Sequence, residues 1–143
     1  MIDKKEINDR IEQLLEKAFV VIDFLPEQVS EDKGNNFART EAFFLQHKDI
    51  IYRHFAYLII KLSSYYDLMI SDSVKIIEDF DPARLYDLFL YSDSRTCLNI
   101  LFREKDSLIT FYGDDLYMTV YNADDSLLEL LRQLSLSEQL FVR

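Results

Sequence analysis

The sequence predicts an α+β domain in which a helical N-terminal two-thirds packs on a small three- to four-stranded antiparallel sheet, followed by a C-terminal helix. Apolar residues recur every three or four positions over most of residues 4–91, which is the period of a helix. From Cys97 onward they recur every second position, with turn residues between the runs, which is typical of a strand meander. A chain of 143 residues has the size of one domain, so we expect a single domain over residues 1–143.

A first helix is predicted from Lys4 to Phe24. Asp3 is suited to cap it, and Glu6 three residues later completes a capping box. Its apolar stripe consists of Ile7, Ile11, Leu14, Leu15, Ala18, Val21, Ile22 and Leu25. Pro26 ends the pattern, because the residue before a proline avoids helical backbone angles. The polar stretch 27–36 is predicted to be a surface loop.

The stretch 37–70 is helical in pattern but apolar on most of its faces, which is typical of a helix buried at the centre of a domain. We expect one bent helix or two shorter ones, with Asp49 as a cap. Its last residues, 65–70, fit a helix or a strand. Two short helices are then predicted, at 74–78 after Asp72-Ser73, and at 83–91 after Asp81-Pro82.

Three strands are predicted in the last third of the chain, separated by turn residues at Lys105-Asp106 and Gly113-Asp114. The inward-facing positions of the first two strands should form the core of the sheet: Leu98, Ile100, Phe102, Ile109 and Phe111. A last helix, 127–134, should begin at the cap formed by residues 124–126. The tail 139–143 is predicted to add an edge strand.

The residues that usually carry chemistry are scarce. Gly34 and Gly113 stand alone, which excludes the glycine-rich phosphate loops and the dinucleotide fingerprint. His47 and His54 would lie about 10 Å apart along a helix, too far to share a metal ion. Cys97 is predicted to be a small apolar residue in a strand. We therefore expect no catalytic residue, no metal and no cofactor.

The net charge of −10 limits the kinds of partner that the protein is expected to bind. It opposes binding to phosphate backbones and to anionic lipid, so neither nucleic acid nor a membrane is an expected partner. A basic protein partner is compatible with it, as is the reading in which the charge serves only solubility. The single cysteine and the lack of a secretory signal at the N-terminus predict the cytoplasm.

Tyrosine is the remaining functional signal, since the chain has 9 Tyr and 11 Phe residues. A tyrosine ring is apolar with a polar tip, which makes it common at protein interfaces. Strand and turn ends should leave such rings beside carboxylates at one rim of the sheet. The predicted protein-binding residues are Asp114, Asp115, Tyr117, Tyr121 and Asp124.

In charge and size the chain resembles small acidic inhibitors that neutralise basic nuclease toxins, although it shares no motif with them. The expected function is a non-enzymatic protein-binding module of the bacterial immunity, antitoxin or adaptor type. Two alternatives stay open. One is a self-associating structural or regulatory protein, which includes a homodimer, and the other is a hydrolase that uses Asp114, Asp115 or Glu104.

Overall fold

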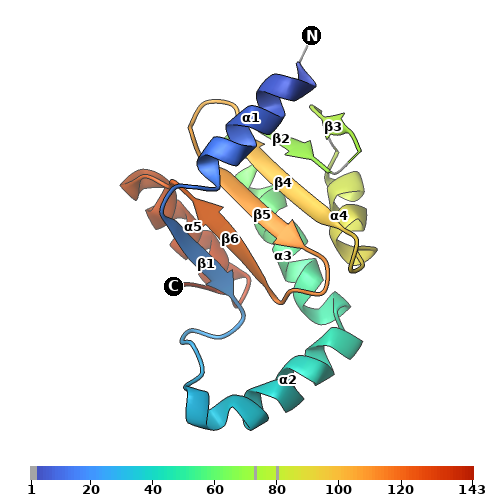
Figure 1. The fold of residues 1–143 in the computed structure, drawn as a ribbon, viewed down its shortest axis with the longest axis vertical. Helices are drawn as coiled ribbons and strands as arrows, with labels where there is room; N and C mark the ends of the chain where they lie inside the picture. Colours follow the sequence, from blue (N-terminus) through green and yellow to red (C-terminus); the bar gives the residue numbers. More distant parts are fainter. Residues whose placement is uncertain (1–2, 73, 80) are drawn as a thin grey trace.

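The computed structural model describes residues 3–72, 74–79 and 81–143. Strands lie between the helices from one end of these residues to the other (Figure 1). The elements are α1 (Lys4–Leu14), β1 (Phe19–Asp23), α2 (Gly34–Gln46), α3 (Asp49–Leu62), β2 (Leu68–Ser71), β3 (Ile76–Ile77), α4 (Pro82–Leu90), β4 (Cys97–Phe102), β5 (Leu108–Tyr112), β6 (Tyr117–Tyr121), α5 (Asp125–Ser137) and β7 (Phe141–Val142). A short 3₁₀ turn, Glu31–Lys33, precedes α2.

The described strands form one antiparallel sheet of seven, in the order β3-β2-β4-β5-β6-β1-β7. The predicted architecture, a helical two-thirds on a sheet of three to four strands, is therefore wrong. Three of the seven strands come from the first two-thirds of the chain and lie between its helices. The predicted meander itself is confirmed as β4, β5 and β6 at the centre of the sheet, and the predicted edge strand is confirmed as β7.

The predicted helix Lys4–Phe24 is two elements, α1 and β1. Asp3 caps α1 as expected, since its side chain accepts a hydrogen bond from the backbone N–H of Lys5 at 2.9 Å. Consecutive β-branched residues at 20–22 favour extended backbone. β1 pairs over its whole length with β6, from Phe19 opposite Tyr121 to Asp23 opposite Tyr117. Tertiary pairing therefore overrode a spacing that also fitted a helix.

Other boundaries differ for related reasons. The predicted loop 27–36 contains the 3₁₀ turn and the start of α2. The ambiguous run 65–70 contains most of β2, which is buried on both faces and so shows no alternation. The predicted helix 74–78 is wrong, because Ile76–Ile77 pairs with β2 as β3. Ser73, its proposed starting residue with Asp72, lies outside the described residues. Asp81 caps α4 as predicted. Within the predicted capping run 124–126, Asp124 is the cap, so α5 begins at Asp125 rather than at 127 and ends at Ser137 rather than at 134.

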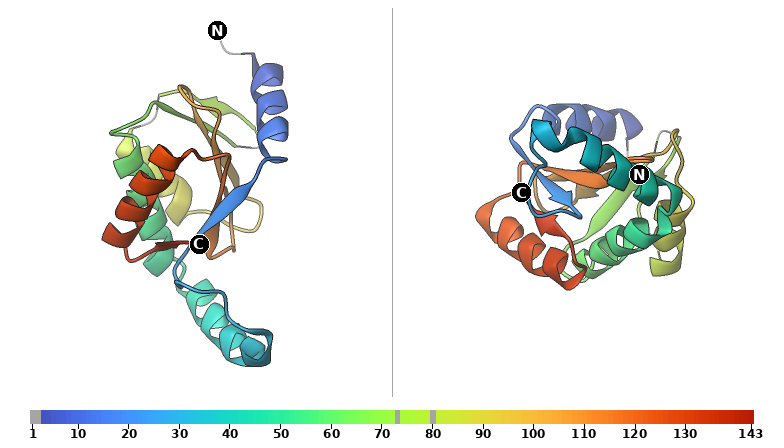
Figure 2. Two further views of the ribbon diagram at one scale, coloured as in Figure 1. Left: turned by 90° about the vertical axis from the view of Figure 1, so that its left-hand side faces the viewer. Right: turned by 90° about the horizontal axis from the view of Figure 1, so that it is seen from below.

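The main core lies between the inner face of the sheet and the helices α3, α4 and α5 (Figure 2). All five predicted core positions are at most 1% exposed: Leu98, Ile100, Phe102, Ile109 and Phe111. At its centre the Phe111 ring lies 4.9 Å from the ring of Tyr52 and 4.8 Å from that of Phe89. Aromatic rings in such tilted and edge-on contacts add to the free energy gained by burial.

The outer face of the sheet is covered only in part. From α1, Ile7, Ile11 and Leu14 pack on Met69, Leu101 and Leu108 of β2, β4 and β5. Figures 1 and 2 show α1 crossing one end of this face. The outer side of β1 and of the first half of β6 is left without a covering helix.

The helix α2 lies apart from the body of the domain (Figure 2). The expectation of a buried central helix holds for α3, which has seven buried residues, but not for α2, which has none. Phe44 holds α2 to the body, with its ring 5.0 Å from that of Phe24. Phe43 beside it is 51% exposed. The two segments have similar sequence patterns, so the sequence did not separate them.

Substitution of neighbouring aromatic residues of β5 should separate the two faces of the sheet. Phe111→Ala should lower the free energy of unfolding by about 3–5 kcal/mol, because it leaves a cavity at the centre of the core. Tyr112→Ala, on the outer face and 43% exposed, should cost about 1 kcal/mol or less. Urea denaturation followed by circular dichroism measures both, and equal losses would contradict this assignment of faces.

Candidate functional site

The turn between β5 and β6 carries the first candidate residues, and its backbone is fixed by close contact with the loop 92–96. The backbone N–H of Gly113 donates to the carbonyl of Thr96 at 3.0 Å. A Cβ atom at Gly113 would lie 1.7 Å from the carbonyl oxygen of Asp93, so only glycine fits. Asp114 follows with a φ of 70°, a left-handed conformation that Asp tolerates better than most residues.

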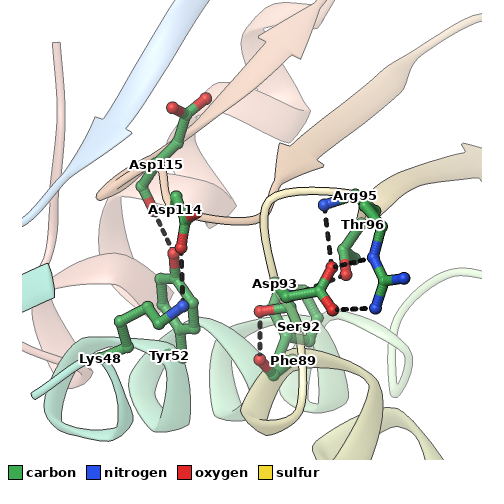
Figure 3. Close-up of polar contacts among 9 residues, drawn as sticks. All are labelled: Lys48, Tyr52, Phe89, Ser92, Asp93, Arg95, Thr96, Asp114 and Asp115. Carbon is green, nitrogen blue, oxygen red and sulfur yellow. Dashed lines mark hydrogen bonds and ion pairs between the residues drawn. The ribbon is translucent and has the colours of Figure 1, made fainter. Parts of the chain in front are cut away.

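Lys48, the residue before α3, and Tyr52 of α3 hold the same turn from the other side (Figure 3). The Lys48 ammonium donates to Oδ1 of Asp114 at 2.6 Å. The Tyr52 hydroxyl donates to the backbone carbonyl of Asp115 at 2.8 Å, and burial raises the pKa of this tyrosine. Because Tyr52 itself is fully buried, this hydrogen bond ties the turn to the core. The carboxylate of Asp115 remains available at the surface.

The outer face of β1 and β6 forms the first feature of the site. We call it the tyrosine face, and it consists of Phe19, Val21, Tyr117, Thr119 and Tyr121. These residues alternate with inward-facing ones along β1 and β6, and register places Phe19 opposite Tyr121 and Val21 opposite Thr119. Phe19 is 62% exposed and Tyr117 is 42% exposed. The tyrosine face and Arg143 enclose a shallow hollow of about 310 Å³.

A groove adjoins the tyrosine face where β1 ends. We call it the acidic groove, and its lining residues are Asp23, Phe24, Leu25, Glu27, Gln28, Val29, Phe37, Glu41, Asp114, Asp115, Leu116, Tyr117 and Arg143. It encloses about 310 Å³ between the segment after β1, the helix α2 and the β5–β6 turn. Five carboxylates and one guanidinium lie along an otherwise largely apolar lining. Tyr117 belongs to both features, and Arg143 lines the groove and the edge of the face, so the face and the groove are continuous.

The groove perturbs the titration of the groups inside it. Burial raises the pKa of Asp115, and the negative charges of Asp114 and Glu41 raise it further, while hydrogen bonding with Tyr117 counteracts them. Burial also raises the pKa of Tyr117, and the negative charge of Asp115 raises it further. Asp115 is therefore a carboxylate whose negative charge is disfavoured in the unbound protein. Carboxylates of this kind are more common at functional sites than elsewhere.

The five predicted binding residues do not form one cluster. Asp114, Asp115 and Tyr117 meet at the groove. Tyr121 lies at the far end of the tyrosine face, where its ring is 5.8 Å from that of Phe19. Asp124 lies beyond it, caps α5 through the N–H of Leu127 and bonds the Lys105 ammonium. These contacts lower the pKa of Asp124, in contrast to that of Asp115.

Several residues of the groove were missed in the sequence. Phe37 and Glu41 come from α2, and Glu27 comes from the segment after β1. Asp23 lies on the outer face of β1, where its carboxylate accepts two hydrogen bonds from the Arg143 guanidinium, one of them at 3.1 Å from Nε. No local motif marks these residues. The pairing of β1 with β6 and β7 positions Asp23 and the segment after β1, and the place of α2 positions Phe37 and Glu41.

Residues considered for chemistry lie apart from one another. Glu104, the third carboxylate of the hydrolase alternative, lies in the β4–β5 turn at the opposite end of β5 from Asp114. Nδ1 of His54 lies 2.9 Å from the Glu138 carboxylate, and burial raises the pKa of the Cys97 thiol. Among the described residues, no three His, Cys, Asp or Glu side chains are placed to hold a metal ion.

Comparison of the chain with known protein families, with curated proteins and with solved structures finds no match. In the part of the chain that the structure describes, each helix is too short or too polar to cross a membrane. The geometry of the tyrosine face and the acidic groove is therefore the basis for a functional proposal.

The two glycines should respond in opposite ways to the same substitution. Gly113→Ala should lower the free energy of unfolding by about 1–3 kcal/mol, because the new methyl group collides with the Asp93 backbone. Gly34→Ala is the matched control, since its Cβ would meet no atom within 4 Å and its backbone is already helical. It should leave stability unchanged or raise it by up to about 1 kcal/mol. Chemical denaturation measures both, and a neutral Gly113→Ala would refute the close approach.

Two isosteric substitutions should separate the carboxylate of the groove from that of the helix cap. Asp115→Asn should raise the melting temperature at pH 7, because the ionised carboxylate costs free energy in the folded state. Asp124→Asn should lower it, because asparagine keeps the cap but loses the attraction to Lys105.

The pH dependence follows from the same pKa shifts. The stability that Asp124 contributes is present above the ordinary carboxyl pKa of about 3.9 and is lost as the pH falls through its lowered value. The penalty at Asp115 disappears as the pH falls through its raised value. The melting temperatures of both variants should therefore approach that of the parent protein as the pH is lowered from 7 to 3. If both variants shift the melting temperature in the same direction at pH 7, the contrast between Asp115 and Asp124 is contradicted.

Proposed function

We propose that this protein is a non-enzymatic, cytoplasmic protein-binding module of the bacterial immunity, antitoxin or adaptor type, with a basic protein as its partner. The binding surface is the tyrosine face together with the acidic groove. Tyr117, which belongs to both features, lies at its centre.

The observation that carries the proposal is the aromatic surface that β1 and β6 present on the outer face of the sheet. Phe19 and Tyr117 are exposed there, and Tyr121 is partly buried beside the cluster that α1 covers. Aromatic side chains that lose solvent contact at the centre of an interface supply much of its binding free energy. Their backbone belongs to paired strands, so the surface is rigid and loses little conformational entropy on binding.

The charges beside this surface favour a basic partner. The carboxylates of the acidic groove lie at its edge, on a protein whose net charge is −10. Such a field speeds the approach of a positively charged protein and makes the association rate depend on salt. It also discriminates against acidic partners, because like charges would face one another at the rim.

A homodimer is the second candidate function, and one observation favours it. The tyrosine face carries no charged side chain of its own; Arg143 lies at its edge. Two copies packed face to face would therefore bury a neutral surface. Sedimentation of the purified protein across a concentration series distinguishes self-association from binding to a different protein.

The double substitution Tyr117→Ala and Tyr121→Ala tests the proposal. A partner captured from the native organism at low salt should bind this variant about 30-fold more weakly, because it loses a central aromatic contact worth about 2 kcal/mol. Tyr65→Ala with Tyr91→Ala is the matched control, since both tyrosines are exposed outside the tyrosine face.

The control variant should keep the parent affinity, and circular dichroism should show that both variants are folded. A folded Tyr117 and Tyr121 variant with unchanged affinity would place the interface elsewhere. Turnover of a substrate by the purified protein would overturn the non-enzymatic assignment.

A further inference from the structure

The lining of the acidic groove suits a side chain that is apolar along its stem and positively charged at its tip. Its apolar part comes from Phe24, Leu25 and Val29 after β1, from Phe37 of α2, and from Leu116. A volume of about 310 Å³ lies at the lower end of the range for small-ligand sites. Lysine and arginine bury their methylene stems against apolar surface while the charged group stays among polar atoms.

The carboxylates of the groove are only partly used by the chain itself. Asp23 is paired with Arg143, and Asp114 is paired with Lys48. Within residues 3–72, 74–79 and 81–143, no ion pair forms at Glu27, Glu41 or Asp115. The two internal pairs show that carboxylates at this rim accept hydrogen bonds from an ammonium and from a guanidinium. The others offer the same chemistry to a cation from outside.

The electrostatic environment of Asp115 supports the same occupant. Its pKa is raised by burial and by Asp114 and Glu41, so the unbound groove holds negative charges that disfavour one another. A positive charge placed among them offsets this repulsion and lowers the pKa of Asp115. The apolar part of the lining distinguishes this arrangement from a metal site, whose ligands would surround the ion with oxygen atoms.

The position of the groove determines where that cation comes from. Tyr117 lies on both the groove and the tyrosine face, and Arg143 lies in the groove and at the edge of the face. A protein bound on the tyrosine face therefore reaches the groove across Tyr117, with no gap in the contact surface. On the opposite wall, α2 has 13 residues and none of them is fully buried, so further contacts would add to its stability. An occupant of the groove supplies them through Phe37 and Glu41.

We infer that the acidic groove is the subsite for a lysine or arginine side chain, presented by an apolar stretch of the basic partner that rests on the tyrosine face. This inference rests on the proposed function and adds to it the chemistry of the partner's central contact. It predicts that binding orders α2 and depends on the positive charge of one side chain.

Two synthetic peptides test the charge requirement by NMR titration of the isotopically labelled protein. One is N-acetyl-Gly-Leu-Arg-Phe-Gly-amide, and the other carries neutral citrulline in place of arginine. The arginine peptide should shift the amide signals of Val29, Glu41 and Tyr117 in a saturable way. The citrulline peptide should bind about tenfold more weakly, since its uncharged group forms no ion pair with the carboxylates.

The variant Glu41→Gln with Asp115→Asn should weaken binding of the arginine peptide by about tenfold. Asp9→Asn with Glu12→Gln on α1 is the matched control, because it removes the same charge from exposed positions outside the groove. It should change the affinity by less than about twofold, which is the effect of net charge alone. Amide exchange of α2 should slow when the arginine peptide is bound.

The inference is overturned if the two peptides bind equally, if the control variant loses as much affinity as the groove variant, or if no saturable shift appears at millimolar peptide. It is also overturned if spermidine gives the saturable groove shifts and the arginine peptide does not, since the groove would then serve a small polyamine.

The same variants distinguish this inference from the proposed function. If the captured partner binds the groove variant with unchanged affinity and salt dependence, while the Tyr117 and Tyr121 substitutions weaken it, the inference fails and the proposed function stands. If the arginine peptide binds the groove but Phe19→Ala with Tyr121→Ala leaves partner binding unchanged, the tyrosine face is misassigned and the groove remains.

Discussion

The pairing of β1 with β6 is the interaction on which the rest of this surface depends. It runs over all five residues of each strand and places β1 between β6 and β7. It brings Asp23 to the Arg143 guanidinium and directs the following segment past the β5–β6 turn. It also aligns Phe19 with Tyr121 across the outer face. Without this pairing there would be neither a tyrosine face nor one wall of the acidic groove.

The elements that local sequence signals determine were predictable, and those that depend on distant pairing were not. The meander, its five core positions, the cap at Asp81 and the capping run 124–126 rest on local signals, namely alternation and the preference of short polar residues for helix starts, and they were predicted. β1 and β2 were not, because Val20–Ile22 and the fully buried run before Ser71 fit a helix as well as a strand. Only distant partners decide such segments. For the site, the turn residues Asp114 and Asp115 and the strand residue Tyr117 were predicted, whereas Phe37 and Glu41 depend on where α2 lies.

The carboxylates of this chain serve two distinct purposes, and their environments distinguish them. Asp81 and Asp124 accept hydrogen bonds from free N–H groups at helix starts, where negative charge is favourable. Asp115 lies among other carboxylates and partly away from water, where negative charge is unfavourable. Natural proteins commonly retain such local costs where function requires them. The adjacent pairs Asp114-Asp115 and Asp124-Asp125 look alike in the sequence, yet only the first lies in the groove.

The exposed helix α2 separates the chain into two segments, and both segments contribute strands to the same sheet. The segment before it contributes α1 and β1, and the segment after it contributes all the other strands. Helices with few buried contacts open locally at low cost, and such places are where proteases cut first. A single cut within α2 would leave α1 and β1 held to the remainder by strand hydrogen bonds on both edges of β1 and by the packing of Ile7, Ile11 and Leu14. The fold is therefore suited to reassembly from two separately produced fragments that meet at this helix.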